Sequence, residues 1–177
     1  MSDVKDYGRA LFELAKEDGT VERVYDDVKA VIAITSDNPE YCLILNSPTL
    51  SKEEKRGMIS EAFGSLDENL CNLLKLLSDK RMAHTYPLAL SGFTDEYDVY
   101  MGILRVDAVT VSPLTEEQSA RLCQKLMAKT GKKIVINNII DASILGGIKL
   151  RYDGIQLDGS IKTRLDKLAE GLDNIVM

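Results

Sequence analysis

The spacing of apolar residues changes once along the chain, close to residue 103, and this change limits what the sequence can fold into. Before it, apolar residues recur at the three- and four-residue intervals of amphipathic helices. After it, Leu104, Val106 and Ala108 alternate with Arg105 and Asp107, which is the two-residue period of a strand. A chain of 177 residues can hold two small domains. We therefore predict an α+β protein with domains at residues 1–105 and 106–177.

The first region contains six stretches of helical periodicity with short turn signals between them. We predict helices over residues 3–17, 20–35, 39–45, 51–63, 67–79 and 86–104. Ser51 is followed by Glu54 at the capping-box spacing, which predicts a helix start there. Six helices with such short loops favour an antiparallel bundle.

The second region combines signals for strands and a helix, as expected of a small α/β domain. Thr115 and Gln118 have the capping-box spacing and open a helix that ends at Gly131. This helix carries Leu122, Cys123, Leu126 and Met127 on one side. Residues 133–136 then have the composition of a strand.

The segment GGIKLRYDGIQLDGS, residues 146–160, predicts a β-hairpin. Asp153-Gly154 is a preferred pair for a two-residue type I′ turn. That turn sets the register: it places Tyr152 opposite Ile155 and Leu150 opposite Leu157 on an apolar face, with Arg151 opposite Gln156 and Lys149 opposite Asp158 on a polar face. Beyond it, Ser160 would cap a last helix with Ile161, Leu165, Leu168 and Leu172 on one stripe.

The sequence carries no arrangement typical of a catalytic, nucleotide or metal site. Gly146-Gly147 precedes a strand and lacks the dinucleotide spacing, and the residues around Gly131 lack the pattern of a phosphate-binding loop. His84 is the only histidine, with no cysteine nearby. We expect no catalytic residue, no cofactor and no metal, so an interaction protein is the better hypothesis than an enzyme.

Charge and composition exclude further classes of protein. Residues 1–105 hold 12 basic and 19 acidic side chains, against 10 and 9 in residues 106–177, so the first domain is unsuited to nucleic acid. No run of about 18 apolar residues occurs, and we expect no direct membrane insertion. The cysteines, Cys42, Cys71 and Cys123, are widely spaced and predict reduced thiols in the core.

Two of the predicted helices carry more apolar surface than a bundle helix needs. In residues 3–17 the apolar positions spread over roughly 200° of the helical wheel, where an arc of about 100° reaches a core. Residues 67–79 show a similar arc, with Leu70, Leu73, Leu74, Leu76 and Leu77. Either both helices lie at the centre of the bundle, or they leave between them an apolar groove for a partner helix.

Several motifs resemble the delta subunit family of the bacterial F-type ATP synthase, whose mitochondrial member is the oligomycin-sensitivity-conferring protein. The resemblance covers nearly the whole chain. It includes YGRALFELA from Tyr7, Asn46-Ser47-Pro48, Asn72-Leu73-Leu74 and the segment from Ile144 to Leu168. The last is the most specific, and its signature positions are Gly146, Gly147, Asp158, Gly159, Ser160, Arg164, Leu165 and Leu168.

The resemblance implies a stator subunit without chemistry of its own, present as one copy per complex. In this family an N-terminal six-helix bundle binds the N-terminal helix of an alpha subunit at the top of the catalytic head. The C-terminal domain binds the b subunits of the peripheral stalk. Combined with the surplus apolar arcs, this predicts a groove for the alpha helix lined by Tyr7, Ala10, Leu11, Leu14, Leu73, Leu76 and Leu77.

Two alternatives remain open from the sequence. A free-standing adaptor could use the same groove for another amphipathic helix, and an RNA-binding helical factor is a weaker option that the acidic first domain opposes. The start of the chain shows no Arg- and Ser-rich transit segment, so we expect the cytoplasmic face of a bacterial plasma membrane.

Overall fold

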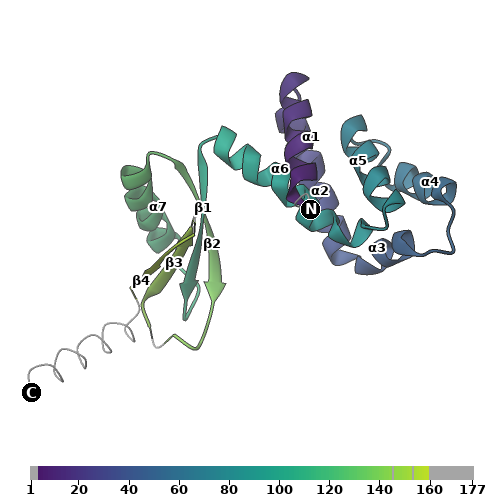
Figure 1. Cartoon of the computed structure of the whole chain (residues 1–177). Coiled ribbons are helices and arrows are strands. Elements are labelled where there is room, and N and C mark those ends of the chain that lie inside the picture. Colours follow the sequence, from purple (N-terminus) through teal and green to yellow (C-terminus); the bar gives the residue numbers. More distant parts are fainter. Residues whose placement is uncertain (1–3, 145, 153, 160–177) are drawn as a thin grey trace, which may run out of the picture. The chain divides into compact units, whose positions relative to one another are not determined.

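The computed structural model describes residues 4–144, 146–152 and 154–159. The chain divides into two compact units, Met1–Tyr100 and Met101–Met177 (Figure 1). The predicted α+β class is confirmed, with α-helices in both units and a four-stranded sheet in the second. The predicted division after Arg105 falls inside the first strand, so the boundary has to be moved to the turn that follows Tyr100.

Within its described residues, unit 1 contains six α-helices and one short 3-10 helix. The helices are α1 (Lys5–Glu17), α2 (Val21–Asp37), α3 (Pro39–Asn46), α4 (Lys52–Phe63), α5 (Glu68–Asp79) and α6 (Tyr86–Tyr100). Their starts agree with the predicted ones to within two residues. The capping box at Ser51 is present, because the Ser51 hydroxyl accepts from Glu54 N and the Glu54 carboxylate accepts from Ser51 N. The predicted end of the last helix at residue 104 is wrong, since Ile103 already belongs to a strand.

Helices α1 and α6 cross with their backbones in close contact. A Cβ atom added to Gly8 would collide with the Ala89 carbonyl, and one added to Gly92 would collide with the Lys5 carbonyl. Each glycine therefore provides the space that the opposite backbone occupies. Phe12 and Phe93 extend this contact with an edge-to-face pair whose ring centroids are 5.4 Å apart. As a result, one side of α1 is fixed against α6.

In its described residues, unit 2 is a mixed sheet with helix α7 packed against it. Its elements are β1 (Ile103–Thr110), α7 (Glu116–Thr130), β2 (Lys133–Ile140), β3 (Ile148–Tyr152) and β4 (Ile155–Asp158). The strand order is β2-β1-β3-β4, with β1 and β2 parallel and the other neighbours antiparallel. Helix α7 connects the two parallel strands, as such a pair requires.

The strand pattern places the core of unit 2 between α7 and one face of the sheet. Leu104, Val106 and Ala108 of β1 are buried there together with Leu126 of α7. Met127, which the sequence placed on the same side of the helix, is about half exposed. Strand β2 runs four residues beyond its predicted end, because its backbone stays paired with β1 as far as Thr110 and Ile140.

The hairpin register predicted from Asp153-Gly154 is confirmed. All four cross-strand pairs of β3 and β4 match the prediction, and Lys149 and Asp158 form an ion pair at 3.2 Å. Gly154 has φ of +74°, the left-handed conformation that a type I′ turn needs. The last helix predicted from Ser160 lies outside the described residues.

Candidate functional site

An apolar groove runs between α1 and α5 on the surface of unit 1. Its volume is about 280 Å³, and its lining comes from only these two helices: Tyr7, Ala10, Leu11, Leu14, Asn69, Asn72, Leu73 and Leu76. Each helix contributes positions i, i+3, i+4 and i+7, which form one continuous face of a helix. Six of the seven residues named from the sequence therefore lie together in one groove.

The floor and the walls of the groove differ in exposure. Leu11 and Leu73 are buried and form the floor, because they also reach the core. Leu14 and Leu76 are 46% and 45% exposed, and Ala10 is exposed as well. Apolar walls that stay in water are costly for an isolated unit and are typical of a surface that a partner covers.

Leu77 does not belong to the groove, although the sequence placed it there. It is fully buried. Leu77 follows Leu70 by seven residues and Leu74 by three, so all three lie on the core side of α5. Leu76 precedes it by one residue, which turns its side chain by about 100° toward the groove.

Polar contacts join α1 and α5 at both ends of the groove. At one end Lys80 Nζ donates to the Tyr7 hydroxyl at 2.7 Å and lies 5.0 Å from the centre of its ring. At the other end Asn69 Nδ2 lies 3.3 Å from Asp18 Oδ2. The start of α1 thus meets the end of α5, so the helices run antiparallel and the spacing of their walls is held at two points.

Asn69 and Asn72 line the groove and were missed by the sequence reasoning. Surface amides are common on helices, so their type gave no signal. Their spacing from Leu73 and Leu76 could have shown them, since these four residues complete one helical face. Asn72 also lines an adjoining polar pocket with Arg56, Lys75 and Asp79.

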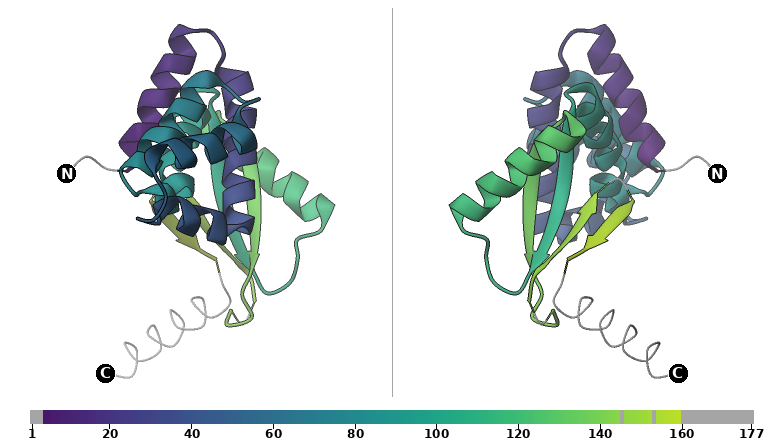
Figure 2. Two further views of the ribbon diagram at one scale, coloured as in Figure 1. Left: turned by 90° about the vertical axis from the view of Figure 1, so that its right-hand side faces the viewer. Right: turned by 90° about the vertical axis from the view of Figure 1, so that its left-hand side faces the viewer.

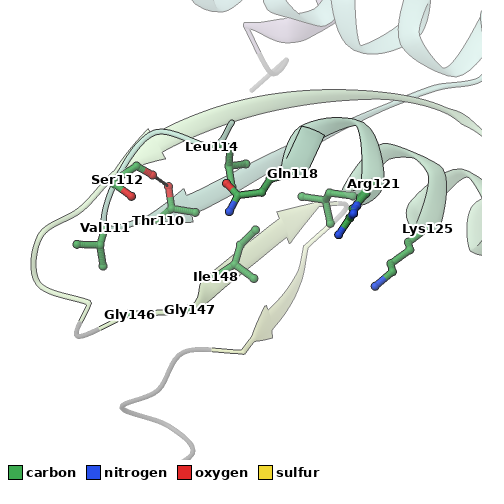
Figure 3. A pocket seen from close by; sticks show the side chains of 11 residues that line it. Thr110, Val111, Ser112, Leu114, Gln118, Arg121, Lys125, Gly146, Gly147 and Ile148 are labelled. Atoms are coloured by element: carbon green, nitrogen blue, oxygen red, sulfur yellow. Dashed lines mark hydrogen bonds between the residues drawn. The ribbon is translucent and has the colours of Figure 1, made fainter. Parts of the chain in front are cut away.

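Unit 2 has its own surface pocket, of about 540 Å³, beside α7 (Figure 3). Its lining joins α7, the end of β1 and the start of β3. Gly146 and Gly147 of the family signature form part of the lining. Of the other signature residues, Asp158 pairs with Lys149 and Gly159 N donates to the Ile148 carbonyl at 3.0 Å. Ser160, Arg164, Leu165 and Leu168 lie outside the described residues.

The cysteines and the histidine, which could in principle react or bind a metal, have structural surroundings. Cys42 and Cys71 are buried, and burial raises the pKa of both thiols. His84 Nδ1 lies 3.0 Å from Asn46 Nδ2 at the surface. Over the described ranges, no group of three or more His, Cys, Asp or Glu side chains could hold a metal ion. No helix within them is long and apolar enough to cross a bilayer.

Comparison with known proteins extends over nearly the whole chain. The family model described as "ATP synthase delta (OSCP) subunit" matches residues 4–172. The ATP synthase subunit delta of Clostridioides difficile (strain 630) is 30% identical over 173 residues, which cover 96% of this chain and 95% of that protein. The subunit delta of Geobacillus sp. (strain WCH70) is 31% identical over 169 residues, 95% of each.

A solved structure shares the fold. It is a chain of the Toxoplasma gondii mitochondrial ATP synthase hexamer, with a TM-score of 0.76 and 22% identity over 97% of this chain and 98% of that one. The family match includes both helices of the groove and the hairpin of unit 2. The chain belongs to the ATP synthase delta (OSCP) subunit family.

Proposed function

We propose that this chain links the catalytic head of an F-type ATP synthase to its peripheral stalk. The chain is a non-catalytic subunit, as its family is. In the proposal, α1 to α6 act as one bundle whose groove holds the N-terminal helix of an alpha subunit, and unit 2 holds the b subunits. A single copy that binds both at once keeps the head from turning with the rotor.

The observation that carries the proposal is the exposed apolar groove between α1 and α5. Its walls extend from position i to position i+7 of each helix, which is about 10 Å of helix length. That length accepts about two turns of an amphipathic helix lying along the groove. Covering the exposed parts of Leu14 and Leu76 would contribute about 1 kcal/mol for each side chain, and the apolar side chains of the partner add to this.

The polar contacts at the groove ends support binding by a preformed site. The hydrogen bonds of Lys80 with Tyr7 and of Asn69 with Asp18 fix the spacing of the two helices without any partner present. A groove that is already open loses little conformational entropy when a helix enters it. The cost of ordering then falls on the partner segment alone.

The location proposed for the assembled subunit is the cytoplasmic face of a bacterial plasma membrane. The homologues that support this are ATP synthase delta subunits from bacteria. In this arrangement the chain attaches to the membrane only through its partners in the complex.

A bridging experiment tests the function. The b subunits are immobilised, the full chain is added, and retention of the soluble catalytic head is measured by immunoblot against the alpha subunit. We expect head retention only when the chain is present, and loss of retention when the head lacks the alpha N-terminal segment. Retention that does not depend on the chain, or on that segment, would refute the proposal.

A further inference from the structure

We propose that the surface of unit 2 beside α7 binds an acidic amphipathic helix of the peripheral stalk. This rests on the proposed function, in which unit 2 holds the stalk, and it adds the location and the charge of the contact. The surface consists of the pocket along α7 and the apolar face of β3 and β4 next to it.

The first observation is an apolar half of the sheet that α7 leaves uncovered. Leu150 of β3 is buried under α7, whereas its partner across the hairpin, Leu157 of β4, is 48% exposed. Ile155, opposite Tyr152, is also 48% exposed. Cross-strand partners point to the same face, so these side chains continue the core face of the sheet. In both views of Figure 2 the hairpin extends to the side away from α7.

The pocket joins this apolar face to α7. Its apolar lining includes Leu114, Leu122 and Ile148. Ile148 and Leu150 are two residues apart on β3 and therefore share a face. Leu157 lies beside Leu150 on β4, so one apolar floor runs from the pocket onto the hairpin.

The charges of the pocket all have one sign. Arg121 and Lys125 are the charged side chains among its lining residues, which include no carboxylate. Figure 3 shows both projecting from α7 on the side where Ile148 lies. Lys125 has no hydrogen bond or ion pair within the described part of the chain, and Arg121 pairs only with Glu117, where both side chains are 74% exposed. A partner with carboxylates on this flank is the complement.

The geometry favours a helix as the partner. Gln118, Arg121, Leu122 and Lys125 occupy positions i, i+3, i+4 and i+7 of α7, which gives a straight ridge of about 10 Å. A second helix packs against such a ridge at an axial distance of about 8–10 Å. Its apolar side would then face Ile148 and Leu157, and its acidic flank would face α7.

The test uses the full chain and three synthetic 18-residue peptides in calorimetry. One peptide has leucines on one helical face and glutamates beside them, the second replaces these glutamates by lysines, and the third is a scrambled form of the first. We expect the first alone to bind, and salt to weaken it. Changing Arg121→Glu and Lys125→Glu together should lower its affinity by about tenfold or more, since two attractions become repulsions.

Lys133→Glu provides the control, because Lys133 is exposed at the start of β2 and alternates with Ile134, which is in the core beneath α7. Lys133 therefore lies on the face of the sheet opposite α7, outside the proposed contact. It should change the affinity by less than about threefold, since an exposed charge outside the contact is screened. Equal binding of the acidic and basic peptides, or equal loss in the control and the double variant, would overturn the inference. So would a large gain in affinity for a chain ending at Gly159, because residues 160–177 would then be the natural occupant.

The same variants are tested with purified b subunits to separate this inference from the proposed function. If the b subunits bind the double variant as tightly as the unmodified chain, the inference is wrong and the proposed function stands. If they do not bind the unmodified chain at all, both are wrong. A loss of b binding in the double variant, with Lys133→Glu unaffected, supports both.

Discussion

Ala10→Asp places a carboxylate in the wall of the groove between α1 and α5 and tests whether that groove binds the alpha helix. Ala10 is exposed in the free chain, so the new side chain remains hydrated and the fold is preserved. The substitution should lower stability only by the helix-propensity difference, about 0.5–0.7 kcal/mol. In the complex the carboxylate would lie against the apolar side of the partner helix.

The size of the effect follows from the proton chemistry of the carboxyl group. Burying it charged and unpaired costs several kcal/mol. The group can instead bind a proton, which at pH 7 costs about 4 kcal/mol for an ordinary Asp pKa of about 3.9. The cost of protonation is therefore an upper limit on the loss of binding free energy, and we expect the affinity for the alpha helix to fall by about 100- to 1,000-fold at pH 7. Desolvation raises the pKa of the group in the complex, and binding should recover by up to about 100-fold at pH 5.

The assay is titration of the full chain with a peptide of the alpha N-terminal segment, at pH 7 and pH 5, beside thermal unfolding of each variant. Ala30→Asp is the matched control, since Ala30 is exposed on α2 outside the groove lining. The control should bind the peptide like the unmodified chain and melt like Ala10→Asp.

Two results would refute this reasoning. Unchanged peptide affinity in Ala10→Asp would mean that the alpha helix does not enter this groove. A loss of affinity accompanied by a much lower melting temperature than that of Ala30→Asp would mean that position 10 supports the core and not a partner.

Three further predictions concern unit 1. Leu77→Ala should destabilise the chain by about 3 kcal/mol because it empties a core site. Leu76→Ala should instead leave the melting temperature nearly unchanged and weaken alpha-peptide binding. Equal melting temperatures of the two variants would contradict the division into core and groove. Gly8→Ala should cost about 1–3 kcal/mol by pushing α1 from α6. By contrast Gly57→Ala, where a Cβ meets open space, should be neutral or stabilising in chemical denaturation. A fragment of residues 1–100 should unfold cooperatively by circular dichroism, and a gradual, non-cooperative melt would show that unit 1 needs unit 2.

Local interactions explain why so much of the fold could be predicted. A capping box needs only residues three apart, as at Ser51 and Thr115, and both formed as expected. The hairpin register follows from a two-residue turn and the alternation around it. Where a long-range contact decided the outcome, as in the pairing that extends β2 along β1 to Ile140, the predicted strand was shorter than the observed one.

The groove marks the limit of sequence reasoning in this protein. Periodicity is a property of one helix at a time. The apolar arcs of α1 and α5 could therefore predict that each helix carries more apolar surface than a core requires. Periodicity could not separate Leu76 from Leu77, since a residue in the core and a residue in a partner groove are both apolar. Only the tertiary structure distinguished them, because the packing of α4 and of residues 83–85 against α5 fixes which side of α5 is closed and which side is left open to a partner.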